Sequence, residues 1–140
     1  MKSIPSNVKK AAEVYNESLE RCVAHGGFVD RFYELFLGSS EEVAEKFKNT
    51  DFVRQKEALR ASLYIMMMAH CWSVECDSHF EEIATRHSRS DLDIRPGLYD
   101  LWLNCLLQAV RETDPLFSLE VEAAWKNTLE PGIEFMKSRY

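Results

Sequence analysis

Apolar residues recur along this chain every three or four positions, the spacing that places them on one face of an α-helix. From Val8 to Val23 the pattern predicts a first helix, preceded by a loose lead-in at residues 1–7. A second helix is expected over about 26–37, with phenylalanines at its inner positions. The segment Gly38–Glu42 then ends it and begins a short helix, because a serine followed by carboxylates suits a helix N-terminus.

In the middle of the chain, two segments with helical spacing of apolar residues flank a segment without a clear pattern. A long helix is expected over about 51–70, after a cap made by Asn49, Thr50 and Asp51. Residues 71–79 are mixed and predict no element. A helix of about two turns should then end at His87.

The last third of the chain predicts two further helices. Pro96 suits the first turn of a helix that runs to about Arg111. The final helix should cover about 116–138, and Pro131 inside it should kink it or divide it. No stretch gives a convincing strand pattern. The predicted fold class is therefore all-α, with roughly six to eight helices.

Composition and charge narrow the functional classes. The 140 residues fit one domain, 1–140, with an ordinary 46% hydrophobic content. A net charge of −6 argues against nucleic acid and against an anionic membrane surface. The first residues have no apolar core of signal-peptide length, and the longest apolar run, Ala61–Ala69, is too short to span a bilayer. We therefore expect a cytoplasmic protein with reduced cysteines.

One histidine stands out as a candidate ligand. Phe80, Ile83 and Ala84 form an apolar stripe that places His87 on the inner face of its helix, before a strongly apolar helix. A histidine in such a place is often only a bonded core residue. All-α chains of this length can, however, pack short and long helices at steep angles around a central pocket. Such a pocket could be lined by Tyr33, Phe47, Gln55 and His87.

A second group of potential ligands lies nearby in the sequence. His70, Cys71, Cys76 and His79 are of the residue types that bind zinc. Their spacing is not that of a known zinc finger. We therefore expect no zinc site here.

The order and spacing of several segments resemble those of a globin. The resemblance rests on the run FYELFLGSSEEVAEKF, the turn QKEAL, His87, and the segment Pro96–Leu107. Fourteen positions separate Tyr33 from Phe47, and 32 separate Gln55 from His87. From about Val8 to Met136 the chain is most similar to bacterial single-domain globins (bacterial haemoglobins) and to the haem domain of flavohaemoglobins. The resemblance implies a globin fold around a pocket for haem b, iron protoporphyrin IX.

The resemblance also implies roles for the residues that would hold the haem. His87 matches the proximal histidine that binds haem iron, and Phe47 matches the phenylalanine that packs on the haem face. Tyr99 and Trp102 match positions that flank the proximal side. Arg86 and Arg89 either meet the haem propionates or remain solvated.

On the distal side, the resemblance assigns the residues that meet the gas. Tyr33 matches the distal position on the second helix, and Gln55 the first inward position on the long helix. Leu59 matches the apolar residue that closes the pocket. The short connection between Phe47 and Gln55 leaves Phe52 or Leu59 as alternative neighbours of the gas.

These roles predict a haem protein that reversibly binds dioxygen, for storage or transport, and also nitric oxide or carbon monoxide. Bound dioxygen carries partial negative charge, so the donors on Tyr33 and Gln55 should slow its release. Nitric oxide dioxygenation or peroxidase-like redox chemistry with a separate reductase, and gas sensing through a partner, remain alternatives. A haem-free ligand-binding globin fold is a further alternative, against which His87 argues. We expect a monomer or a homodimer.

Overall fold

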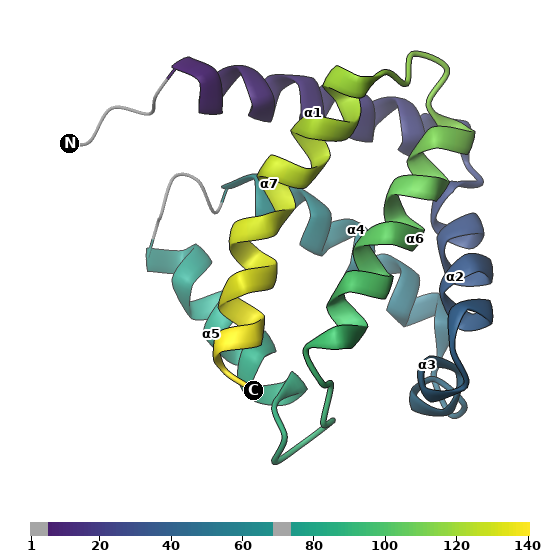
Figure 1. The fold of residues 1–140 in the computed structure, drawn as a ribbon, viewed down its shortest axis with the longest axis vertical. Helices are drawn as coiled ribbons and strands as arrows, with labels where there is room; N and C mark the ends of the chain where they lie inside the picture. Colours follow the sequence, from purple (N-terminus) through teal and green to yellow (C-terminus); the bar gives the residue numbers. More distant parts are fainter. Residues whose placement is uncertain (1–5, 69–73) are drawn as a thin grey trace.

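The computed structural model describes residues 6–68 and 74–140, and within these ranges all regular structure is helical (Figure 1). The elements are, in order, α1 (Ser6–His25), α2 (Phe28–Ser39), α3 (Glu41–Lys46), α4 (Phe52–Met68), α5 (Val74–His87), α6 (Gly97–Thr113) and α7 (Leu119–Ser138). The all-α class predicted from the apolar spacing is confirmed.

Two helices differ from the pattern-based prediction. α5 has 14 residues, whereas the sequence predicted about two turns. The prediction was too short because Glu75, Asp77 and Ser78 interrupt the apolar spacing, although they do not interrupt the helix. The segment contains neither Gly nor Pro before His87, so nothing in its backbone stops helix propagation. The length of a helix and the length of its apolar stripe are thus different quantities here.

Pro131 does not divide the last helix, since α7 continues from Leu119 to Ser138 as one element. The proline nitrogen cannot donate to the carbonyl four residues earlier. Leu129, Gly132 and Ile133 are nevertheless buried on both sides of it. Tertiary packing of these residues outweighs the missing hydrogen bond.

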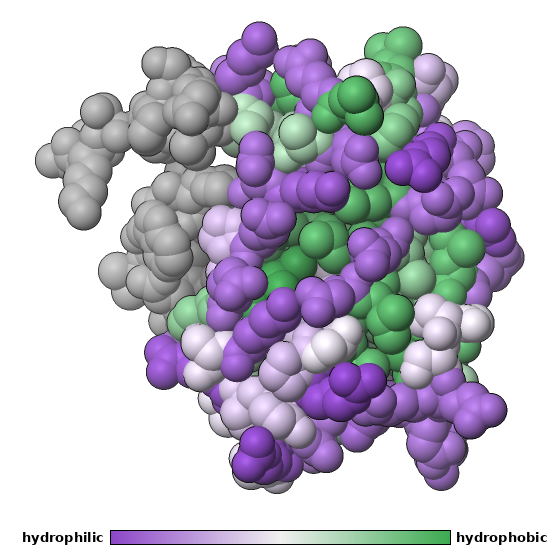
Figure 2. Space-filling model, viewed as in Figure 1, coloured by the Kyte–Doolittle hydropathy of each residue, from purple (hydrophilic) through white to green (hydrophobic). Residues whose placement is uncertain are grey.

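The helices pack in two closely contacting pairs, α2 with α6 and α1 with α7. Figure 1 shows α1 lying across one end of α6 and α7, while α5 lies beside the other end of α7. The largest fully buried side chains include Trp125, Tyr15, Phe28 and Phe32. In the space-filling view, polar side chains cover most of the face above α6 and α7, with apolar ones visible between them (Figure 2). None of the described helices is long and apolar enough to cross a membrane.

A buried polar cluster joins α1 to the connection between α6 and α7. We call it the Asp114 cluster; it consists of Ser18, Arg21, Asp114 and Trp125. Asp114 accepts bonds from Ser18 Oγ at 2.6 Å and from Arg21 Nε at 2.6 Å. Trp125 Nε1 donates to Ser18 Oγ at 2.9 Å. A side chain that is costly to bury is therefore fully hydrogen-bonded.

Two cysteine side chains, those of Cys22 and Cys105, lie in the described part of the chain. Cys22 is buried and Cys105 is half-buried, and both are free. Thr113 Oγ1 donates to Cys22 Sγ at 3.5 Å. Burial raises the pKa of the Cys22 thiol to about 11, so it stays protonated at neutral pH.

Candidate functional site

Tyr33 and Gln55 form a side-chain pair between α2 and α4. Tyr33 is only 4% exposed, and its hydroxyl accepts a bond from Gln55 Nε2 at 3.1 Å. The hydroxyl also points to the Gln55 backbone oxygen, at 3.4 Å, which is long for an O–H donor. Asp51 fixes the start of α4, where Gln55 lies, by accepting a bond from Val53 N at 3.1 Å. The hydrogen of the Tyr33 hydroxyl is thus weakly engaged while its oxygen is well satisfied.

Two phenylalanines enclose the Tyr33 ring. The ring centroids of Phe47 and Phe52 lie 6.0 and 5.6 Å from that of Tyr33, in edge-on geometry. Phe47 and Phe52 stack on each other at 6.1 Å. Phe47 occupies the C-cap of α3 and Phe52 begins α4, so the short connection between these helices brings the two rings together. Phe52, one of two alternative neighbours suggested by the sequence, is therefore in contact with Tyr33.

The Tyr33 environment keeps its hydroxyl protonated. Burial raises the pKa of Tyr33 to about 12, although the bond from Gln55 partly offsets this effect. At neutral pH Tyr33 is therefore a neutral hydrogen-bond donor. This is the form that can donate to a ligand with partial negative charge.

His87 is the last residue of α5 and is half-buried. Its Nδ1 lies 2.8 Å from the Ile83 carbonyl oxygen, which can only accept, so Nδ1 carries the hydrogen. Nε2 then keeps its lone pair. Burial lowers the pKa of His87 despite the bond to Ile83, so the ring is neutral at neutral pH. A neutral imidazole oriented by a carbonyl is the form in which histidine binds metals.

Three further residues assigned by the globin resemblance pack in or against the core. Leu59 is buried, while Tyr99 and Trp102 are half-buried. The Trp102 ring contacts Phe32 at 6.1 Å, and Phe32 contacts Tyr33 at 4.9 Å. Trp102 is thereby joined to the aromatic group around Tyr33. Burial raises the pKa of Tyr99 to about 12, so it is also neutral.

The described contacts bring the distal candidates together but leave His87 apart from them. Tyr33 contacts both Gln55 and Phe47. Among the described residues, no hydrogen bond or ring contact joins the His87 ring to this group.

Two contacts that the sequence did not indicate join α3 to the connection between α5 and α6, which follows His87. Lys46, at the end of α3 beside Phe47, donates from Nζ to the Leu92 carbonyl at 3.0 Å. Arg95 Nε lies 2.7 Å from Glu42 Oε1. Both bonds reach the connection between α5 and α6 from α3. The sequence does not indicate which charged side chains on separate surface segments come into contact, so these bonds could not be predicted from it.

The two arginines beside His87 are exposed. The Arg89 guanidinium lies over the Tyr140 ring, 4.8 Å from its centroid. Arg86 lines a shallow surface hollow together with Glu81, Glu82 and Asp91. The structure thus gives Arg89 a protein partner and leaves Arg86 beside carboxylates.

The zinc-type residues named from the sequence fall outside the described part of the chain. His70 and Cys71 lie outside the described residues. The side chains of Cys76 and His79 are not described either. Elsewhere in the described residues, no group of three or more His, Cys, Asp or Glu is arranged to hold a metal ion.

Comparisons with known proteins place this geometry in a family. No family model matches the chain, and no curated protein matches it. A crystal structure from Pseudomonas aeruginosa PAO1, described as structurally highly homologous to a human haemoglobin, does match. It is 42% identical, with a TM-score of 0.89, over 93% of this chain and 98% of that chain. The chain therefore belongs to the same family as this haemoglobin-like bacterial protein, and its fold is globin-like.

Proposed function

We propose that this protein binds haem b with His87 as the axial ligand of the iron, and reversibly binds dioxygen or another diatomic gas. The observation that carries the proposal is the state of His87. Its Nδ1 is held by the Ile83 carbonyl at 2.8 Å, so Nε2 of the neutral ring keeps a lone pair that no described residue engages. The family relationship to a haemoglobin-like protein supports the same reading.

The residues present fit a large planar cofactor. Phe47, Phe52, Tyr99 and Trp102 pack against the core yet remain partly exposed. Half-covered aromatic side chains on two helices, α4 and α6, and at the end of α3 are what a flat apolar macrocycle needs to bury. The proposed iron ligand fits as well. A single imidazole, that of His87, would leave the opposite coordination position of the iron open for a gas.

Haem supplies, when bound, a coordination position at which a diatomic gas binds reversibly. The chain supplies hydrogen bonds to that gas. Gln55 Nε2 donates to Tyr33 Oη at 3.1 Å, and this bond polarises the hydroxyl and strengthens it as a donor. The hydroxyl hydrogen is free to turn to a ligand, because its present acceptor lies 3.4 Å away. Such bonds should stabilise bound dioxygen more than bound carbon monoxide, because bound dioxygen carries the greater partial negative charge.

The visible spectrum of the purified protein tests the proposal. We expect a Soret band after haem addition and its loss or large shift in His87→Ala. His25→Ala is the matched control, because His25 is exposed at the end of α1. Circular dichroism should show that both variants remain helical. A wild-type protein that takes up no haem, or a His87→Ala spectrum equal to that of wild type, would contradict the assignment.

The Tyr33–Gln55 pair also favours a second candidate, nitric oxide dioxygenation. Slow dioxygen release gives nitric oxide time to react, and the products balance as one nitrate per dioxygen and nitric oxide with one electron consumed. That electron must come from a separate reductase. Nitric oxide consumption by the purified protein with a generic reductase should be catalytic. A stable dioxygen complex that consumes no nitric oxide would exclude this activity.

A further inference from the structure

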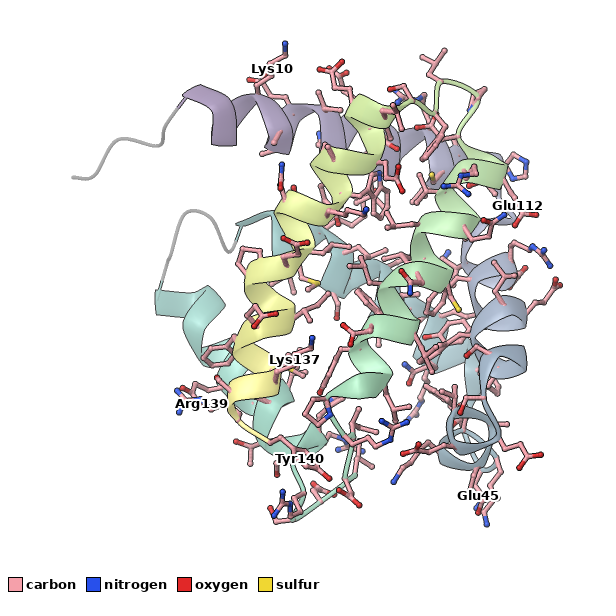
Figure 3. The ribbon with its side chains drawn as sticks, in the orientation of Figure 1. Lys10, Glu45, Glu112, Lys137, Arg139 and Tyr140 are labelled. Atoms are coloured by element: carbon pink, nitrogen blue, oxygen red, sulfur yellow. The ribbon has the colours of Figure 1, made fainter. Side chains whose placement is uncertain are left out.

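The two residues after α7, Arg139 and Tyr140, contact α5 and the connection that follows it (Figure 3). Arg139 Nη2 lies 2.6 Å from Glu81 Oε1, in the middle of α5. Tyr140 Oη donates to Asp93 Oδ1 at 2.5 Å. Arg89 N donates to the Tyr140 carbonyl at 3.4 Å. We call this set of contacts the Arg139–Tyr140 clamp.

The clamp reaches both sides of His87 along the chain. Glu81 precedes His87 by six residues, and Asp93 follows it by six. Figure 3 shows Arg139 directed towards α5 and Tyr140 beside the connection between α5 and α6. Since α5 packs on α7, contacts from the end of α7 bear on the position of His87.

Asp93 has a special place in the turn that ends α5. Its φ of 53° is the only positive φ of a described residue other than glycine. Aspartate tolerates this conformation better than most residues, but at a cost. The turn brings Asp93 N to the Ser88 carbonyl at 2.9 Å and Ile94 N to the His87 carbonyl at 3.0 Å. These bonds satisfy carbonyls that a helix end would otherwise leave open.

We propose that Arg139 and Tyr140 are positioning residues for His87, an inference that rests on the proposed haem function. The Tyr140 hydroxyl fixes the left-handed Asp93, and Asp93 sets the bond from Ile94 N to the His87 carbonyl. Arg139 fixes α5 against α7 through Glu81. Each exposed contact is weak alone. Their value lies in geometry, because two adjacent residues restrain α5 and the turn after it together.

The clamp is tested by removing one hydroxyl. In Tyr140→Phe, the amides of Asp93 and Ile94 should exchange about three- to tenfold faster, the change expected from one exposed bond to a carboxylate. Haem transfer from the loaded protein to excess haem-free scavenger globin should accelerate by a similar factor. The iron–histidine stretching band in the resonance Raman spectrum should shift or broaden.

Matched variants separate this role from general weakening. Tyr64→Phe removes a similar exposed bond, since Tyr64 Oη donates to Glu20 Oε1 at 3.0 Å between α4 and α1. It should leave the iron–histidine band and the haem transfer rate unchanged. Asp93→Asn keeps an acceptor oxygen and tolerates a positive φ, so it should remain close to wild type. Asp93→Ala should behave like Tyr140→Phe or worse.

The outcomes are distinct for each proposal. If wild type takes up no haem, the proposed function fails and the positioning role fails with it. If wild type binds haem and Tyr140→Phe matches Tyr64→Phe in haem transfer and Raman band, only the positioning role fails. Faster amide exchange with an unchanged Raman band would make the clamp a purely structural contact and would also overturn the inference.

Discussion

The Asp114 cluster and the Tyr33–Gln55 pair use buried polar groups in opposite ways. In the Asp114 cluster, both carboxylate oxygens of Asp114 accept bonds, and the Ser18 and Trp125 donors have acceptors. At the pair, the Tyr33 hydroxyl hydrogen has only a distant acceptor, and Gln55 is half-exposed. One region is closed on itself, and the other retains hydrogen-bonding capacity.

This difference separates stability from binding. A closed buried cluster loses stability when one member is removed, because the remaining polar groups are left unpaired. A group with unused capacity loses little stability when it is changed. Its removal should instead show in the binding of whatever accepts the free bond. The two regions thus predict different responses to equally conservative substitutions.

The largest expected effect is on the stability of Asp114→Ala. The side chain is fully buried and bound to Arg21 and Ser18. Its removal should lower the free energy of unfolding by about 3 kcal/mol, measured by urea denaturation. Asp100→Asn is the control, because Asp100 is exposed and pairs only at the surface with Lys137. An effect on Asp114→Ala no larger than on the control would remove the distinction between the regions.

The next effect is on gas release. Tyr33→Phe should raise the dioxygen dissociation rate by about one to two powers of ten, since a bond to a partly charged acceptor contributes about 1.5–3 kcal/mol. Carbon monoxide dissociation should change less. Flash photolysis or stopped-flow mixing measures both rates, with Tyr64→Phe as the control. An unchanged dioxygen rate would show that Tyr33 does not meet the gas.

Acid should reduce the first effect gradually. Burial tends to raise the pKa of Asp114, but bonds from Arg21, Ser18 and Leu116 N outweigh it and hold the pKa below its ordinary value. A depressed pKa in the folded state gives stability that is present above the unfolded pKa, near about 4. That stability is lost as pH falls through the folded pKa. The difference between wild type and Asp114→Ala should therefore shrink from about pH 5 downwards. A difference that stays constant to acid would contradict the linkage.

The smallest effect is on the stability of Gln55→Ala. Gln55 is half-exposed, so water can replace its bond to Tyr33 Oη. The free energy of unfolding should fall by less than about 1 kcal/mol, while the dioxygen dissociation rate rises. Thermal unfolding and stopped-flow mixing on one preparation measure the pair of values. A loss of stability comparable to that of Asp114→Ala would show that the pair is a structural cluster after all.

The sequence predicted which segments are helical more accurately than it predicted where each helix begins and ends. Apolar spacing of three and four predicted the all-α class and the approximate course of α1, α2 and α6. It missed the first half of α5, where Glu75 and Asp77 break the stripe without breaking the helix. Of the two outcomes it allowed at Pro131, a kink or a division, the division does not occur, because burial around the proline is a tertiary property.

For the candidate site, the resemblance to globins indicated which residues to consider. The structure then showed which hydrogen-bond and ring partners these residues have. Tyr33 contacts both Gln55 and Phe47, and the roles of all three towards haem and gas stay predictions. The acceptor for His87 Nδ1 is one turn back on its own helix, at Ile83, which helical spacing alone allows but does not dictate. The bonds from Lys46 to Leu92 and from Tyr140 to Asp93 had no signal in the sequence.

The sequence by itself determined the helices and the burial of one face of each, because apolar periodicity is local and survives any arrangement of the elements. Only the tertiary structure decided which polar atoms meet. Asp114 bonds Ser18 across 96 positions, and Tyr140 bonds Asp93 across 47. Such pairs depend on where helix ends come to lie after packing. The same packing leaves the Tyr33 hydroxyl hydrogen with an acceptor 3.4 Å away, and it leaves His87 Nε2 without a hydrogen-bond partner among the described residues.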